Sequence, residues 1–187
     1  MEFINKQSLR DRVLTLIRNQ EESERLSKST AIAAKLYEIP AFQKAEQVLF
    51  YASFDGEVDT FPMIKQAEML GKKIGLPKID KATHRMTPYL LDCSIDDCLS
   101  GPYGIKEPAA SAVKMKITDK NTIIVVPGVA FDKQHNRIGR GAGFYDRFLE
   151  NIPQEVSTVG LAYDFQVFDE LPFIEDHDVP LSTVVTN

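Results

Sequence analysis

Residues 127–149, PGVAFDKQHNRIGRGAGFYDRFL, decide the fold class because they join an expected strand to an expected helix through a glycine-rich loop. The preceding residues 122–126, TIIVV, are a short apolar run of β-branched side chains that stops at Pro127-Gly128, which predicts a buried strand. Beyond the loop, Phe144, Phe148 and Leu149 keep helical spacing. A buried strand that leads through a loop into a helix is typical of an α/β protein.

The loop has the composition of an anion-binding site. Glycine admits positive φ and lets backbone N–H groups approach an anion, and Gly139, Gly141 and Gly143 stand at the turn into the helix. Arg137 and Arg140 add charged, fork-shaped donors. The spacing matches neither the P-loop, which needs Lys-Ser/Thr after its last glycine, nor the dinucleotide fingerprint, which needs another glycine in place of phenylalanine. A solvated turn is the alternative interpretation.

Asp146 follows the last glycine by three residues and falls in the expected first turn of the helix. Its carboxylate could simply interact with the positive end of the helix dipole. It could also hold a Mg²⁺ ion that bridges bound phosphates, since magnesium prefers one or two carboxylates plus substrate oxygens. The residue pattern leaves both interpretations open.

Strand and helix patterns alternate along the rest of the chain. Helices are expected over residues 29–39 and 59–70, and strands near residues 47–53, 72–77, 86–91, 122–126, 156–162 and 181–185. This alternation predicts one domain over residues 1–187, an α/β sandwich with a mainly parallel sheet. Ligands of such sheets gather beyond the carboxyl ends of strands, where Phe54, Glu57 and the glycine loop lie.

The amino-terminal segment predicts a further, amphipathic helix. Its apolar residues recur at helical spacing: Leu9, Val13, Leu16 and Ile17. Lys6 and Arg10 therefore lie one turn apart on a shared face. Taken from the residues alone, this face is solvated.

Composition excludes several classes of function. The net charge of -5 over 187 residues argues against a nucleic-acid surface, which normally shows a basic face. The apolar runs are too short to span a membrane, and the amino terminus has no apolar signal core, so we expect a cytoplasmic protein. Cys93 and Cys98, the only cysteines, are expected to be reduced thiols, with a zinc site that adds His84 as a minor alternative. We also expect a monomer.

Several motifs extend beyond the glycine loop. Around the loop they are Pro127-Gly128, Phe131-Asp132, Asn136-Arg137, Gly139-Arg140-Gly141, Gly143 and Tyr145-Asp146. Elsewhere they are Lys6-x-x-x-Arg10, YASFxxEVDT over residues 51–60, GLAY over residues 160–163 and HDVP over residues 177–180. Together they resemble the 5-formyltetrahydrofolate cyclo-ligases, also called 5,10-methenyltetrahydrofolate synthetases, along the whole chain. Ala142 departs from the pattern, since some members carry lysine there, so the phosphate contact of that lysine cannot be carried over.

The resemblance implies a three-layer α/β/α Rossmann-like sandwich and an ATP- and Mg²⁺-dependent enzyme. The substrate would be 5-formyltetrahydrofolate, with or without a polyglutamate tail, and the products 5,10-methenyltetrahydrofolate, ADP and phosphate. The formyl oxygen would attack the γ-phosphate of ATP, and the bridge nitrogen would then close the ring as phosphate leaves. Such chemistry requires positioning and charge neutralisation rather than a protein nucleophile.

The resemblance also implies the residues of the site. Those that would contact ATP are Lys6, Arg10, Arg137, Gly139, Arg140, Gly141, Ala142, Gly143 and Tyr145, with Arg140 and Tyr145 as the catalytic residues. Those that would contact the folate are Ala52, Phe54, Glu57 and Tyr103, and those that would hold Mg²⁺ are Asp146 and Asp178. Glu57 could instead cap the helix expected from Asp59, and Asp178 could belong to a polar turn.

Two other classes of protein stay open. A nucleotide-binding regulator that lacks turnover would fit the alanine at position 142. A sugar-phosphate isomerase or acyl-transfer enzyme on the same sandwich would need one phosphate and no magnesium. The Asp146 carboxylate beside the glycine loop favours a metal nucleotide over a sugar phosphate.

Overall fold

The computed structural model describes residues 5–80, 82–98, 100–101, 105–118, 120–175 and 178–187, so Tyr103 and His177 lie outside the described residues. The helices are α1 (Lys6–Arg18), α2 (Glu22–Glu38), α3 (Pro40–Lys44), α4 (Phe61–Met69), α5 (Phe144–Leu149) and the 3-10 helix η2 (Asp164–Gln166). The strands are β1 (Gln47–Leu49), β2 (Lys73–Asp80), β3 (Arg85–Leu90), β4 (Thr122–Val126), β5 (Ala130–Asp132), β6 (Arg137–Ile138), β7 (Ser157–Ala162), β8 (Val167–Phe168) and β9 (Thr183–Thr186).

The main sheet has six strands in the order β3-β2-β1-β4-β7-β9. Strands β2, β1, β4, β7 and β9 run parallel to one another. Strand β3 pairs antiparallel with β2 at one edge. A central parallel strand is covered on both faces, which explains why the apolar run TIIVV is buried at every position of β4. The prediction of a mainly parallel sheet is confirmed.

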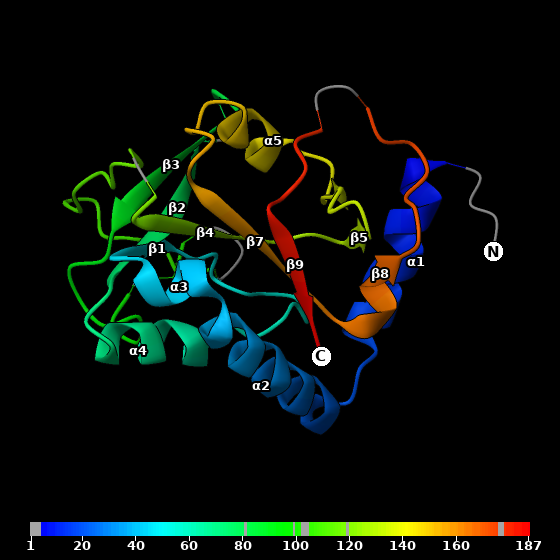
Figure 1. The fold of residues 1–187 in the computed structure, drawn as a ribbon, viewed down its shortest axis with the longest axis horizontal. Coiled ribbons are helices and arrows are strands. Elements are labelled where there is room, and N and C mark those ends of the chain that lie inside the picture. The colour runs from blue at the N-terminus through cyan, green and yellow to red at the C-terminus, as the bar shows by residue number, and fades with distance from the viewer. Residues whose placement is uncertain (1–4, 81, 99, 102–104, 119, 176–177) are drawn as a thin grey trace.

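Helices cover both faces of this sheet, with α2, α3 and α4 on one side and α5 on the other (Figure 1). The side chains of β4 alternate between the two layers. Ile123 and Val125 pack in the core that includes α2, α3 and α4, whereas Ile124 and Val126 pack with Leu149 of α5. Burying each of these side chains contributes about 1.5–3 kcal/mol. The predicted three-layer arrangement is confirmed.

Several element boundaries differ from the sequence prediction. Helix α2 begins at Glu22 instead of residue 29. The prediction missed its first two turns, ESERLSK, because they contain little apolar periodicity. Strand β1 ends at Leu49 instead of residue 53, and Tyr51 and Ala52 are buried without belonging to a strand. Helix α4 begins at Phe61 rather than residue 59, and Pro62 lies in its first turn, where a missing N–H costs nothing.

A second, three-stranded sheet with the order β6-β5-β8 was not predicted. Its strands have only two or three residues, which is too short for a periodic signal. Leu9 of α1 packs in one buried cluster with Ala130 of β5 and Ile138 of β6. This cluster fixes α1 against the strand that leads directly into the glycine loop.

Asp132 holds the turn between β5 and β6. Its side chain is buried and accepts hydrogen bonds from the backbone N–H groups of Gln134 (3.0 Å), Asn136 (2.9 Å) and Leu171 (3.2 Å). It also accepts one from the Asn136 side-chain amide at 3.0 Å. A buried carboxylate with this many donors is well satisfied, so the turn sets the direction in which β6 approaches the site.

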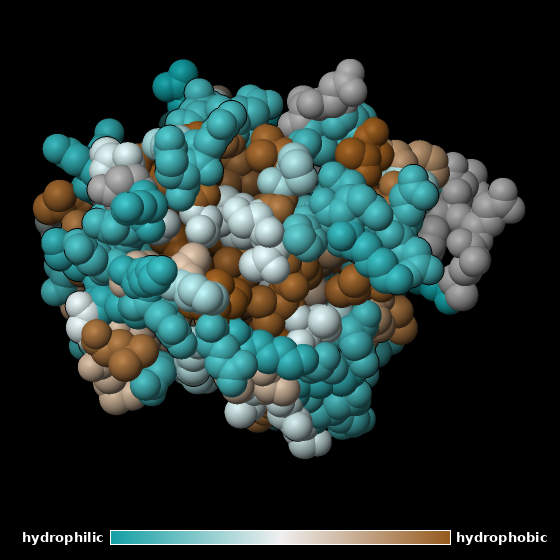
Figure 2. All heavy atoms as spheres, viewed as in Figure 1, coloured by the Kyte–Doolittle hydropathy of each residue, from teal (hydrophilic) through white to brown (hydrophobic). Residues whose placement is uncertain are grey.

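Hydrophilic residues cover most of the face seen in Figure 2, with hydrophobic residues visible toward its centre. Within the described part of the chain, no helix combines the length and the apolar character needed to cross a membrane.

Candidate active site

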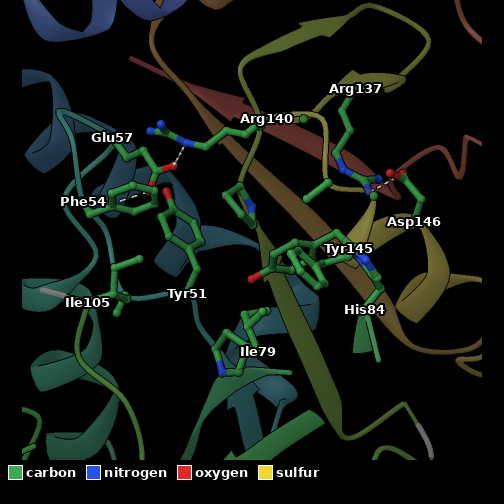
Figure 3. A pocket seen from close by; sticks show the side chains of 18 of the residues that line it. Tyr51, Phe54, Glu57, Ile79, His84, Ile105, Arg137, Arg140, Tyr145 and Asp146 are labelled. Atoms are coloured by element: carbon green, nitrogen blue, oxygen red, sulfur yellow. Dashed lines mark hydrogen bonds and ion pairs between the residues drawn. The ribbon is translucent and has the colours of Figure 1, made fainter. Parts of the chain in front are cut away.

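A cavity of about 530 Å³ opens beyond the carboxyl ends of β1 and β4, where ligands of parallel sheets gather. Its volume suits a small-molecule ligand. Figure 3 shows Tyr51, Phe54 and Glu57 on one side of the cavity and Arg137 and Asp146 on the other. The predicted site residues that line it are Ala52, Phe54, Glu57, Arg137, Gly139, Arg140, Ala142, Gly143, Tyr145 and Asp146.

The glycine loop connects β6 to α5 along this cavity. Gly141 has φ of 104° and Gly143, the residue before α5, has φ of 65°, so both use the left-handed region that glycine enters freely. Gly139 is different, because an added Cβ would meet no atom within 4 Å. The loop therefore requires glycine for its backbone conformation at positions 141 and 143. At position 139 a side chain would find free space.

Arg137 is a buried side chain of β6, the strand that leads into the glycine loop. Its guanidinium donates to the Asp146 carboxylate at 2.5 Å and to the Val179 backbone oxygen at 3.0 Å. Burial lowers the pKa of Arg137, and the negative charges of Asp146 and Asp178 partly oppose this shift. The cavity wall thus carries a buried arginine that is paired with the Asp146 carboxylate.

Arg140 crosses the mouth of the cavity from the glycine loop to the segment after β1. Its guanidinium donates to Glu57 at 3.1 Å and to Asp55 at 2.9 Å, and lies 4.3 Å from the centre of the Phe54 ring. Asp55 also binds the Arg18 guanidinium through both of its oxygens, at 2.7 to 3.0 Å. Hydrogen bonding to Arg18, followed by Arg140, keeps the pKa of Asp55 below its ordinary value despite partial burial.

Glu57 faces the cavity and does not cap α4. Its two oxygens accept from Arg140 and, at 3.3 Å, from the backbone N–H of Phe54. The N-cap of α4 is Thr60, which corrects the alternative interpretation of this carboxylate as a helix cap. Burial raises the pKa of Glu57, and the Arg140 charge only partly reverses the shift. The side chain is therefore a desolvated carboxylate with capacity to accept further donors.

Tyr145, in the first turn of α5, places a buried hydroxyl at the cavity. Among the described residues, this oxygen has no hydrogen-bond partner. Burial raises the pKa of Tyr145 far above its ordinary range, so the hydroxyl stays protonated. Figure 3 shows its ring between the Tyr51 side and the Arg137 side of the cavity. A buried hydroxyl without a partner costs stability unless a ligand completes its hydrogen bonding.

Helix α1 contacts the site through both of its predicted cations. The Arg10 guanidinium donates to the Gly139 backbone oxygen at 2.9 Å. The Lys6 ammonium donates to Asp178 at 3.0 Å and to Glu175 at 3.4 Å. The face that carries both residues is therefore in contact with the rest of the protein, rather than fully solvated, although neither residue is in the set that lines the cavity.

The sequence of the chain matches one protein family along almost its whole length. A family model described as the 5-formyltetrahydrofolate cyclo-ligase family covers residues 3–187. The chain belongs to the 5-formyltetrahydrofolate cyclo-ligase family.

Individual relatives agree with this assignment. The 5-formyltetrahydrofolate cyclo-ligase of Escherichia coli (strain K12) is 32% identical over 178 residues, which cover 95% of this chain and 94% of the relative. The solved structure of Aquifex aeolicus 5,10-methenyltetrahydrofolate synthetase has a TM-score of 0.82 at 35% identity and covers 97% of this chain and 89% of its own. The Mycoplasma pneumoniae synthetase, at 20% identity and a TM-score of 0.74, shares the fold over 98% of this chain and 99% of its own. The predicted family and the predicted ligase class are confirmed.

The two residues expected to hold magnesium have different positions. Asp146 lines the cavity, whereas Asp178 lies outside the lining set and binds Lys6. Both carboxylates act on the Arg137 guanidinium, which places them in one electrostatic neighbourhood. Within the described ranges, no three His, Cys, Asp or Glu side chains are arranged to hold a metal, and this also leaves the zinc alternative without support.

Sequence reasoning missed a part of the cavity wall that is formed by β2 and the segments after β2 and β3. Pro77 and Ile79 of β2 line the cavity with His84, whose ring stacks on Phe144 at 6.1 Å between centroids. Ile105 and Glu107 complete this side. No spacing rule links these residues to the glycine loop, because only the pairing of β2 with β1 brings them to the same end of the sheet.

Proposed function

We propose that the protein converts 5-formyltetrahydrofolate to 5,10-methenyltetrahydrofolate in a reaction that consumes ATP and requires Mg²⁺. One observation carries the proposal: a single cavity joins a desolvated carboxylate and aromatic wall, at Glu57 and Phe54, to a glycine loop with two arginines. The first wall suits a flat, amino-substituted ring, and the second suits phosphate. An enzyme that transfers phosphate to a folate must hold both groups side by side.

The folate side of the site would be formed by Glu57, Phe54 and Ala52. A carboxylate matches two parallel N–H donors, and the edge of the aminopyrimidine ring of a pterin presents such a pair. A planar group, the Arg140 guanidinium, lies on the Phe54 ring at 4.3 Å, so a pterin could take the same place once Arg140 moves away. A pterin bound in this place would replace the Arg140 guanidinium as the planar donor to Glu57.

The phosphate side of the site would be formed by the glycine loop with Arg10, Arg137 and Arg140. These residues fit a polyphosphate, because three guanidinium groups line or adjoin a loop that is free of side chains at its glycines. Arg140 is more adaptable than Arg137, since it is only partly buried, whereas Arg137 is buried at 2.5 Å from Asp146. Arg140 would stabilise the charge that develops during transfer.

Tyr145 would complete the site from the centre of the cavity. Its protonated hydroxyl needs an acceptor or a donor that the described residues do not supply. A ligand oxygen between the folate and phosphate walls would provide one. The hydroxyl would then orient the reacting group without changing its own protonation state.

When bound, ATP would supply the phosphoryl group that makes the formyl oxygen a leaving group, and Mg²⁺ would neutralise phosphate charge. Asp146 is the carboxylate best placed to hold the metal, because it lines the cavity beside the glycine loop. Asp178 would be a weaker ligand, since the Lys6 ammonium already lies 3.0 Å from one of its oxygens. The site therefore supplies oxygen donors of the kind that magnesium prefers, each now paired with a basic side chain.

The test is direct. Purified protein is mixed with 5-formyltetrahydrofolate, ATP and Mg²⁺, and the near-ultraviolet absorbance of the conjugated methenyl product is followed, with controls that lack ATP or metal. Growth of absorbance that needs both additions is the expected result. No growth from folded protein that still binds ATP would contradict the proposal and favour the regulator, for which the exposed Ala142 on the cavity wall is the supporting observation.

A further inference from the structure

Two cysteines that lie outside the cavity lining are held next to each other. The sulfur atoms of Cys93 and Cys98 are 3.7 Å apart. Cys93 is exposed and Cys98 is buried. A disulfide needs a sulfur–sulfur distance of about 2.05 Å, so the two thiols are neighbours that are not bonded, and a side chain must move for the bond to form.

The backbone around the two cysteines is fixed by hydrogen bonds. Within the turn, Asp97 N–H donates to the Ser94 oxygen at 3.0 Å. From outside the turn, the Lys106 ammonium donates to the backbone oxygens of Cys98 at 2.6 Å and Asp96 at 2.9 Å. Ile95, between the cysteines, is fully buried in the main core. These contacts keep the thiols adjacent in the folded protein, so their effective concentration toward each other is high.

The environment gives the two thiols different roles. Burial, followed by the hydrogen bond to Cys93, raises the pKa of Cys98 to about 11. Cys98 is therefore a protonated, enclosed thiol, whereas Cys93 is open to reagents in solution. A metal site is a poorer fit, because the described residues offer no third His, Cys, Asp or Glu ligand beside the pair.

We propose that Cys93 and Cys98 form a redox-active dithiol that low-molecular-weight disulfides oxidise reversibly to an intramolecular disulfide. The Cys93 thiolate attacks one sulfur of the small disulfide, and the first small thiol leaves. Cys98 then gives its proton to solvent and attacks the Cys93 sulfur, which releases the second small thiol. Two protein thiols and one small disulfide become one protein disulfide and two small thiols. This modification site does not depend on the proposed cyclo-ligase reaction.

The test uses reduced full-length protein, equilibrated without oxygen in glutathione buffers of increasing oxidised fraction. The samples are quenched with a thiol-alkylating reagent and analysed by intact mass and by the single proteolytic peptide that contains both cysteines. We expect the two thiols to disappear together, with no glutathione attached. The proposal fails if both thiols are still alkylated in the most oxidising buffer, or if the product is a stable glutathione adduct.

Matched variants separate the two steps. Cys98→Ser leaves the exposed thiol alone and should stop at the mixed disulfide with glutathione. Cys93→Ser leaves the buried thiol alone and should stay largely unmodified while the protein is folded. The wild-type protein in urea should need a more oxidising buffer than the folded protein, because the turn no longer holds the thiols together. Equal behaviour with and without urea would overturn the proposal.

Discussion

Arg140 is neutralised by two carboxylates in the absence of ligand, so any phosphate must compete with them for the guanidinium. Glu57 and Asp55 accept at 3.1 and 2.9 Å, but the Arg140 and Asp55 side chains are each about 30% exposed. The partly exposed Arg140–Asp55 pair is worth only about 0–1 kcal/mol. The Glu57 side chain is only 10% exposed, so its pair with Arg140 is more buried and costs more to break. A phosphate that accepts two N–H bonds from the same guanidinium can therefore displace Asp55 more readily than Glu57.

The first prediction is that Arg140→Ala lowers turnover by more than about tenfold, because a preorganised donor to developing charge is lost. The fold should persist, because the Arg140 side chain is partly exposed. Steady-state kinetics with the methenyl absorbance, together with a thermal melt, measure both effects. Arg12→Ala is a matched control, since Arg12 is an exposed residue of α1. Wild-type turnover in Arg140→Ala would remove this residue from the mechanism.

The second prediction concerns the orphaned hydroxyl of Tyr145. Tyr145→Phe should leave stability unchanged or raise it by up to about 1 kcal/mol, because an unsatisfied buried polar group is removed. The same variant should lose turnover, because the hydroxyl no longer orients the ligand. Urea denaturation and kcat measure the two quantities on one sample. A large loss of stability with unchanged kcat would show that the hydroxyl is structural.

The third prediction uses the raised pKa of Glu57. A carboxyl with a higher pKa in the folded protein binds more protons there than in the unfolded chain. Its contribution to the free energy of unfolding is therefore complete below the ordinary pKa of 4.5 and falls as the pH rises toward the folded value. Glu57→Gln removes this dependence. In urea denaturation across the acidic range, the variant should gain stability relative to wild type as the pH rises, and parallel curves would contradict the prediction.

At the scale of elements, α1 connects the small sheet to the glycine loop. Leu9 packs on β5 and β6, which aims Arg10 at the Gly139 oxygen. The fourth prediction is that Arg10→Ala raises the KM for ATP by about tenfold, the loss expected for a charge-assisted contact. Melting temperature should change little, since the removed side chain is partly exposed. Arg12→Ala on the same helix should change neither the KM for ATP nor the melting temperature. An equal effect of both variants would show that the loss of positive charge, rather than the Arg10 contact, changes the KM.

Elements with strong local signals could be predicted from the sequence. The buried run of β4, the glycines at its loop and the spacing of α1 each express one structural requirement in consecutive residues. The small sheet could not be predicted, because strands of two or three residues acquire their partners only after the chain has folded. Arg137 is buried because it belongs to that small sheet, so its burial could not be predicted from the sequence either.

The site shows the same division. The Asp55–Gly56 pair could have indicated a turn, and both residues do have positive φ, of 54° and 83°. Nothing in the sequence pointed to the contact of Arg18 with Asp55, 37 residues away, or of Arg140 with Asp55, 85 residues away. Long side chains that meet across the fold leave no periodic signal. The contact between Lys6 and Asp178 could not be predicted either, because the two residues are far apart in the sequence.

At the scale of the whole molecule, the cavity exists only because distant segments fold together. Residues after β1, β2 and β4 supply separate walls, and α1 supports the loop from outside. A ligand that touches several of these segments binds only the folded state and must stabilise all of them together. Nucleotide binding is therefore coupled to global stability, and this coupling provides a test of the metal that does not require turnover.

The last prediction is that ATP with Mg²⁺ raises the melting temperature more than ATP alone or Mg²⁺ alone. At a ligand concentration near 100 times Kd, the expected stabilisation is about 2.7 kcal/mol. The metal effect should appear because Asp146 and the phosphates together bind Mg²⁺ better than either does alone. Addition of a chelator should return the melting temperature to that of ATP alone. Equal shifts with and without Mg²⁺ would contradict a magnesium site beside the glycine loop, whereas no shift with any nucleotide would contradict the phosphate site itself.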